Sequence, residues 1–236
     1  MRLSQATAAV LSVAAFAAAA LSPTSALAQD TVDIGTIADE DIVVVQRLLY
    51  PKDGRTELGA HLGVMPFDAF LLTPNIQLSF DKHLSETVAF SVLAGGGYGI
   101  KNGTYNQLSD PGYGVEPNAY RYLGSLLAGV QWAPIYAKMN VNAERIIHHD
   151  VYGVARAGVT FESSTIPQGG FFPSPTVSVG IGGRLWTSEN FALRIELRDD
   201  LMVQQRKLEE NAWYFKQNAG ITVGITRFSA VKRRTR

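Results

Sequence analysis

The sequence predicts an all-β protein, an eight-stranded antiparallel transmembrane β-barrel. Three observations support this prediction: runs that alternate between apolar and polar residues, an N-terminal segment typical of exported proteins, and connections that alternate between short and long. In the run 191–203, the apolar residues Leu193, Ile195 and Leu197 share one face, and charged residues occupy the other. Because side chains alternate between the two faces of a strand, each run has one apolar side and one side too charged for a dry core.

The two sides of these strands distinguish two architectures. A soluble sandwich buries its apolar side, whereas a membrane barrel turns that side to lipid and its charged side to the lumen. The chain has no cysteine, so neither disulfides nor an acylated lipoprotein anchor are available to it. Lys+Arg and Asp+Glu number 21 each, and this balance argues against a nucleic-acid partner.

The N-terminus is typical of a secretory signal peptide. Met1-Arg2 gives a basic start, residues 8–21 form an apolar core, and Ala26-Leu27-Ala28 has the small residues of a cleavage site. We expect cleavage after Ala28, so that residues 1–28 are removed. A retained transmembrane helix is the alternative, but the apolar core is shorter than the roughly 18–20 residues that a span needs.

The mature chain divides into three predicted parts. Residues 29–54 form a periplasmic N-terminal lead-in that ends in a turn at 51–54, residues 55–228 form the outer-membrane barrel, and residues 229–236 form a basic C-terminal tail. The expected strands are 55–65, 70–80, 87–100, 120–131, 146–161, 175–187, 190–204 and 214–228. Their even number and their lengths suit a bacterial outer-membrane barrel, whose strands need roughly 9–11 residues each to cross the hydrocarbon.

The connections alternate in length, as expected if they lie on opposite sides of a membrane. Residues 81–86 and 187–190 are short, whereas 101–119 and 162–174 are longer. The segment 133–145 is ambiguous, because residues 135–141 offer a ninth short strand. We expect eight strands, since an even number places both termini in the periplasm and lets the last strand close on the first.

The alternation assigns each side chain to lipid or to the lumen. The lipid-facing set includes Leu58, Leu62, Ile76, Leu78, Phe90, Leu126, Val130, Val177, Val179, Ile181, Leu193, Ile195, Leu197, Ile221, Val223 and Ile225. An eight-stranded barrel is just wide enough for side chains to fill it, so lumenal arginines and carboxylates should pair with one another. The candidate site is this lumenal charge network: Glu57, Arg156, Arg184, Arg194, Glu196, Arg198 and Asp200. Aromatic residues near the strand ends, including Phe80, Trp132, Phe191, Phe228, Tyr98, Tyr120, Tyr122 and Trp213, predict two girdles.

Catalytic, cofactor and metal sites are not predicted. The glycine-rich stretches 95–99 and 180–183 lack the Gly-Lys-Ser/Thr of a phosphate loop. His148 and His149 point to opposite faces of a strand, so they cannot share a metal ion. His61 and Glu57 share a lumenal face, where a structural polar pair is the simpler interpretation and a hydrolase of outer-membrane lipid the alternative.

Several motifs in order resemble a family of outer-membrane β-barrel proteins typical of myxobacteria and their relatives. The matching stretches are Val43-Val44-Val45-Gln46-Arg47, Gly54-Arg55, Glu57-Leu58, Pro66-Phe67-Asp68-Ala69-Phe70, Phe80, His83-Leu84-Ser85-Glu86, Trp132-Ala133-Pro134-Ile135-Tyr136-Ala137-Lys138, Asp150-Val151-Tyr152 and residues 193–199. The resemblance covers nearly all of the mature chain. It implies a barrel without enzymatic activity, and several family members belong to the adventurous gliding-motility machinery.

The predicted function is therefore a non-enzymatic outer-membrane barrel, embedded in lipid, that holds other envelope proteins in a complex such as gliding-motility machinery. A small pore is the alternative. Partner contacts are expected in the loop 101–119 and the adjoining strand start, where Tyr105, Tyr113 and Tyr120 are candidate aromatic anchors. The lead-in residues 42–47 are a second candidate contact.

Overall fold

The computed structural model describes residues 49–141, 145–166, 170–206 and 212–230. The predicted signal peptide, most of the lead-in and residues 231–236 of the basic tail lie outside these ranges.

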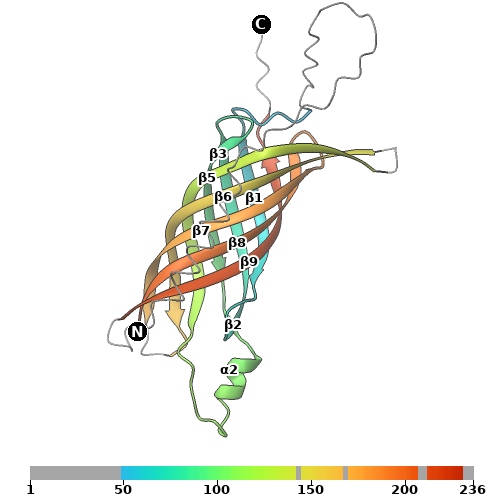
Figure 1. Ribbon diagram of the computed structural model, residues 1–236. Coiled ribbons are helices and arrows are strands. Elements are labelled where there is room, and N and C mark those ends of the chain that lie inside the picture. Colours follow the sequence, from blue (N-terminus) through green and yellow to red (C-terminus); the bar gives the residue numbers. More distant parts are fainter. Residues whose placement is uncertain (1–48, 142–144, 167–169, 207–211, 231–236) are drawn as a thin grey trace, which may run out of the picture. The chain divides into compact units, whose positions relative to one another are not determined.

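Eight long antiparallel strands form a closed ring (Figure 1). They are β1 (Thr56–Met65), β2 (Leu71–His83), β3 (Val88–Gly97), β5 (Tyr120–Val141), β6 (Arg145–Ser164), β7 (Phe171–Trp186), β8 (Phe191–Arg206) and β9 (Ala212–Phe228). Each strand pairs with its neighbours in the chain, and β1 pairs with both β2 and β9, which closes the ring. The two-residue β4 (Ile100–Lys101) only extends the edge beside Leu71 and Leu72. The predicted eight-stranded barrel is confirmed.

The ring has two different ends. The turn end holds the start of β1, the end of β9 and the short connections 84–87 and 187–190. The loop end holds the connections 66–70, 98–119 and 165–170, of which the second is long. Helix α2 (Gly103–Leu108) lies in that long connection and was not predicted. It begins after Asn102, whose side chain accepts a hydrogen bond from the Tyr105 amide, as an N-cap residue does.

The ambiguous segment 133–145 is neither a plain connection nor a ninth strand. β5 continues to Val141 and pairs with β6 as a long hairpin. The register shifts between Trp132 and Ile135, around Pro134. β3 pairs with β5 only as far as Trp132, so residues 135–141 pair with β6 alone, and Figure 1 shows the hairpin standing out beyond the ring. Because proline cannot donate a ladder hydrogen bond, it fits the point where β5 becomes an edge strand.

The barrel is apolar outside and charged inside. Leu62, Ile76 and Ile195 are 68%, 61% and 45% exposed on the outer surface. The largest fully buried side chains, in contrast, include Arg156 and Arg184. The predicted two-sided alternation therefore holds around the ring.

The structure differs from the predicted aromatic girdles at three residues. Phe80, Trp132 and Phe191 are exposed at the turn end, as predicted. Phe228 is only 2% exposed, because it lies opposite Glu57 and shares the inward phase of β9. Tyr120 and Tyr122 likewise point inward on β5 and are buried. Position along the strand was predicted correctly for these three residues, but their face was not.

Candidate functional site: the lumenal charge network

All seven residues of the predicted network lie in the lumen, and each is at most 4% exposed. They come from four strands: Glu57 from β1, Arg156 from β6, Arg184 from β7, and the remaining four from β8. The structure brings most of them together, adds acidic partners that were not predicted, and separates Arg198 and Asp200 from the rest.

Arg184 links β7 to β1, which is not its neighbour in the ring, and also to the neighbouring β6. Its Nη2 lies 2.7 Å from Oε2 of Glu57, and its Nη1 lies 2.8 Å from Oδ2 of Asp150. The same Asp150 oxygen accepts from Nζ of Lys52 at 2.7 Å. Glu57 Oε2 also lies 3.0 Å from Nε2 of His83.

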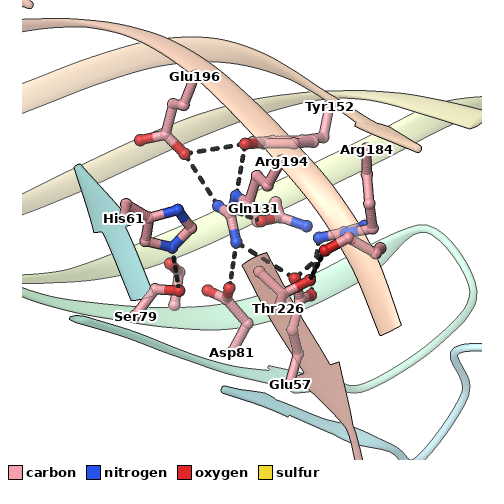
Figure 2. A network of polar contacts seen from close by, with 12 residues as sticks. Glu57, His61, Ser79, Asp81, Gln131, Tyr152, Arg184, Arg194, Glu196 and Thr226 are labelled. Carbon is pink, nitrogen blue, oxygen red and sulfur yellow. Dashed lines mark hydrogen bonds and ion pairs between the residues drawn. The ribbon is translucent and has the colours of Figure 1, made fainter. Parts of the chain in front are cut away.

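Arg194 lies at the centre of the cluster, as Figure 2 shows. Its Nη1 lies 2.5 Å from Oδ2 of Asp81 and 3.5 Å from Oε1 of Glu57. Its Nη2 donates to Glu196 at 2.9 Å and to Gln131 at 3.0 Å. Arg194 therefore joins strands β8, β2, β1 and β5 through one guanidinium group.

Glu196 completes the cluster with Arg156 and Tyr152. Arg156 Nη1 donates to Glu196 at 2.7 Å, and the Tyr152 hydroxyl donates at 3.0 Å. The Tyr152 ring lies 4.5 Å from the Arg194 guanidinium carbon. Gly182 makes room for this ring, because a Cβ there would lie 2.2 Å from the Tyr152 hydroxyl oxygen.

The charges of this turn-end cluster balance. Four cations (Lys52, Arg156, Arg184 and Arg194) meet four carboxylates (Glu57, Asp81, Asp150 and Glu196). Buried ions are tolerated when they are paired and hydrogen-bonded, whereas an unpaired one is strongly destabilising. The balance explains how so many charges can be packed without contact with water.

Arg198 and Asp200 form a separate pair in the middle of the lumen, here called the mid-lumen pair. Arg198 Nε lies 3.0 Å from Oδ1 of Asp200, two residues along the same strand, and Nη1 donates to Gln77 at 3.0 Å. A third group of charged side chains lies at the loop end. There Lys216 Nζ lies 3.2 Å from Glu162 and 3.1 Å from Asp68.

Sequence reasoning missed Asp81, Asp150 and Lys52. Asp81 was assigned to a turn, because the second strand was expected to end at Phe80 whereas β2 runs to His83. Asp150 shares the inward phase of Tyr152 and Arg156, which could have revealed it. Lys52 precedes the sheet, so no strand pattern could have placed it.

Residues 49–55, here called the strap, cover the turn end of the lumen. Tyr50 stacks on Trp186 with ring centroids 5.1 Å apart, and the Lys52 amide donates to Glu86 at 2.8 Å. Arg55 donates to the carbonyl of Ser229 at 2.7 Å. Burial lowers the pKa of Arg55, although nearby carboxylates oppose the shift. The predicted lead-in therefore contacts the barrel through its last residues.

The His61 and Glu57 pair considered from the sequence does not form. His61 Nε2 lies 2.9 Å from the Ser79 hydroxyl instead, and the histidine is 5% exposed within the packed lumen. Within the described ranges, no group of three or more His, Asp or Glu side chains could hold a metal ion. The described part of the chain has no helix long and apolar enough to cross a membrane.

The three candidate partner contacts differ in exposure. Tyr113 is 66% exposed in the long connection. Tyr105 is 1% exposed, because α2 packs it against Leu71 and Ala119, and Tyr120 is 3% exposed at the start of β5. The structure corrects the prediction for Tyr105 and Tyr120, which present no free surface to a partner.

A closed antiparallel ring with a charged, packed lumen and an apolar exterior defines a transmembrane β-barrel. No protein-family profile and no curated protein match the chain. Among solved structures, it is similar to a de novo designed transmembrane β-barrel (15% identity, 77% of this chain and 100% of that chain, TM-score 0.38). It is also similar to Neisserial surface protein A (12% identity, 73% of this chain and 95% of that chain, TM-score 0.44). A third similar structure is Ail, the attachment invasion locus protein of Yersinia pestis (11% identity, 75% of this chain and 99% of that chain, TM-score 0.40). The closed ring of eight long strands in this chain itself defines the fold.

Proposed function

We propose that the protein is a non-enzymatic barrel of the bacterial outer membrane that holds partner proteins in an envelope complex, with both termini in the periplasm. The observation that carries the proposal is the filled lumen. Arg156, Arg184 and Arg194 span its interior and are each less than 2% exposed. With the lumen occupied by paired charges, the free surfaces of the barrel are its exterior and its two ends.

A filled lumen favours this function over a small pore. A water-filled channel would leave the side chains that line it exposed to water, whereas Ser91, Thr160 and Asp200 are all 0% exposed. The strap lies over the turn end, and the Lys216 group ties the 66–70 connection to β6 and β9 at the loop end. Transport through this lumen would require a rearrangement of several buried ion pairs.

The extension of the β5–β6 hairpin is the best-formed surface for a partner. Residues 135–141 pair with β6 alone, so their other backbone edge is unpaired by any described strand. A partner can add an extended segment to such an edge, as in other cases of β-strand addition. Ile135, Met139 and Ile146 are 53%, 48% and 62% exposed and offer an apolar contact beside the edge.

The loop end offers a second surface. Tyr113 and Val115 are 66% and 54% exposed in the long connection, and Phe67 is 78% exposed in the neighbouring one. Tyrosine and other aromatic residues are enriched among side chains that dominate interface energies. A role in gliding motility is the finer proposal, and it is supported by the resemblance of the ordered sequence motifs to that barrel family.

Crosslinking and co-purification from detergent-solubilised envelopes test the proposal. We expect partner proteins to co-purify with the full chain, and to be lost when residues 135–149 are replaced by a two-residue turn that keeps the eight-stranded ring. Tyr113→Ser is a matched change at the other end, and it separates loop-end partners from hairpin partners. Stable open conductance of the pure protein in planar bilayers, with no partner captured by crosslinking, would instead establish the pore.

A further inference from the structure

The extension of the β5–β6 hairpin, residues 135–140 and 146–151, has two unlike faces. Its register with β6 places six side chains in the outward phase that Ala155 and Ala157 follow on the barrel: Ile135, Ala137, Met139, Ile147, His149 and Val151. Ile135 and Met139 are 53% and 48% exposed on this face. Apart from His149 the face is apolar, and it continues the apolar exterior of the ring.

The opposite face of the extension is mainly polar, and its root is attached to the strap. Lys138 and Asn140 are exposed on this face. The Tyr136 hydroxyl lies 2.8 Å from Nδ1 of His148, and the His148 ring meets the Tyr50 ring edge-on with centroids 5.0 Å apart. Because the strap contacts this inward face, the apolar outward face is the one that the described chain leaves uncovered.

The extension leaves the ring at the level of the turn-end girdle. Trp132, which is 47% exposed, marks that level, since tryptophan side chains favour the headgroup region of a bilayer. The register shift around Pro134 follows at once, and Figure 1 shows the hairpin turning sideways from the ring. When a strand turns away from the barrel axis, the face that was outward on the barrel turns toward the adjacent leaflet.

The unpaired edge of the extension limits how deeply it can lie in a membrane. Residues 135–140 pair with β6 alone, so part of their backbone has no partner in a described strand. Unpaired backbone groups are strongly unfavourable in hydrocarbon, whereas water reaches them among the headgroups. Amphipathic helices that lie on membranes bury an apolar face about 5–10 Å into this boundary, and a two-stranded ribbon with one apolar face can do the same.

We propose that the extension lies on the leaflet at the turn end, with Ile135, Ala137 and Met139 in the headgroup region of the phospholipid bilayer. The inference rests on the proposed function, which places the barrel in a membrane. Continuity with the lipid-facing exterior identifies lipid as the occupant of this face, and the exposed Lys138 and Asn140 remain in water. The contact holds the unpaired edge in the plane of the membrane, where it stays open to the partner segment proposed above.

Fluorescent probes on the two faces test this contact. Since the chain has no cysteine, Met139→Cys and Ile146→Cys can each carry a single environment-sensitive fluorophore in the mature chain, reconstituted into phosphatidylcholine nanodiscs. Ile146 is the matched control, because it is 62% exposed on the inward face of the same hairpin, opposite Asn140. We expect lipid spin-labelled near its headgroup to quench the probe at 139 and not the probe at 146. Iodide should quench the probe at 139 several-fold less than the probe at 146.

The outcomes separate this contact from the proposed function. Equal iodide quenching at the two positions would show that both faces lie in water and would overturn the contact. Protection at 139 without quenching by spin-labelled lipid would assign the face to a protein, which also overturns it. Ile135→Cys repeats the outward measurement if Met139→Cys does not fold. Loss of the heat-modifiable gel shift in the unlabelled chain would instead overturn the membrane function itself.

Discussion

The turn-end cluster and the mid-lumen pair use the same chemistry with different connectivity. In the cluster, the ion pair of Arg184 with Glu57 joins residues 127 positions apart in the sequence, and that of Arg194 with Asp81 joins residues 113 positions apart. In the mid-lumen pair, Arg198 and Asp200 are two residues apart on β8. Ion pairs between distant strands can form only when the ring is closed, whereas a pair within one strand does not depend on closure. The cluster therefore ties the closed barrel together, and the pair mainly neutralises its own strand.

The largest expected effect comes from breaking the cluster at Glu57. Glu57→Gln keeps the shape but removes the charge that faces Arg184, Arg194 and His83. Loss of one partner from a buried ion pair costs roughly 3–5 kcal/mol of folding free energy. The urea midpoint of the refolded barrel measures this loss, and an unchanged midpoint would show that the cluster is hydrated.

Ile195→Arg tests the other face of the same strand. Ile195 lies between Arg194 and Glu196 but points outward and is 45% exposed. An arginine near the bilayer midplane costs roughly 2–4 kcal/mol on the lipid face of a barrel. Val179→Arg on β7 should behave in the same way, as measured by the heat-modifiable gel shift and the urea midpoint in lipid vesicles. If both variants match the wild type, the outer face has been assigned wrongly.

Lys52→Met should have a smaller effect, because Asp150 keeps its bond to Arg184 at 2.8 Å. A hydrogen bond to a charged group contributes roughly 1.5–3 kcal/mol. We expect the strap to loosen while the ring stays closed. Since the chain has no cysteine, a single cysteine at Tyr50 reports this loosening through faster maleimide labelling. Equal labelling rates with and without Lys52 would contradict the role of this lysine in holding the strap.

Replacement of both partners of the mid-lumen pair, Arg198→Met with Asp200→Asn, should have the smallest effect of the series. The double change removes the two charges of the 3.0 Å contact together, so neither ion is left unpaired in the lumen. Because replacing a whole buried ion pair by neutral side chains is often close to neutral, we expect the free energy of unfolding, measured from the urea transition, to change by no more than about 1 kcal/mol. A loss as large as that of Glu57→Gln would remove the distinction between the two groups.

The sequence predicted the two faces of the strands better than their ends. The period of two placed Glu57, Arg184 and Arg194 in the lumen, because one charged residue among apolar neighbours fixes the phase of a whole strand. It could not show that β2 continues to Asp81, since polar residues near a strand end look like a turn.

Two further features were not predictable from local pattern. The hairpin extension has no consistent alternation around Pro134, because the register shift there breaks the phase of β5. The burial of Tyr105 depends on α2, a single six-residue helix, whose packing against Leu71 brings together residues 34 positions apart.

The strap also determines how the barrel would carry mechanical load. A partner that pulled on the lead-in would first load the contact of Lys52 with Asp150, and through it Arg184 on β7 and Glu57 on β1. Force would then spread over several strands instead of peeling β1 away one hydrogen bond at a time. Single-molecule pulling from residue 49 should show a higher first rupture force for the wild type than for Lys52→Met.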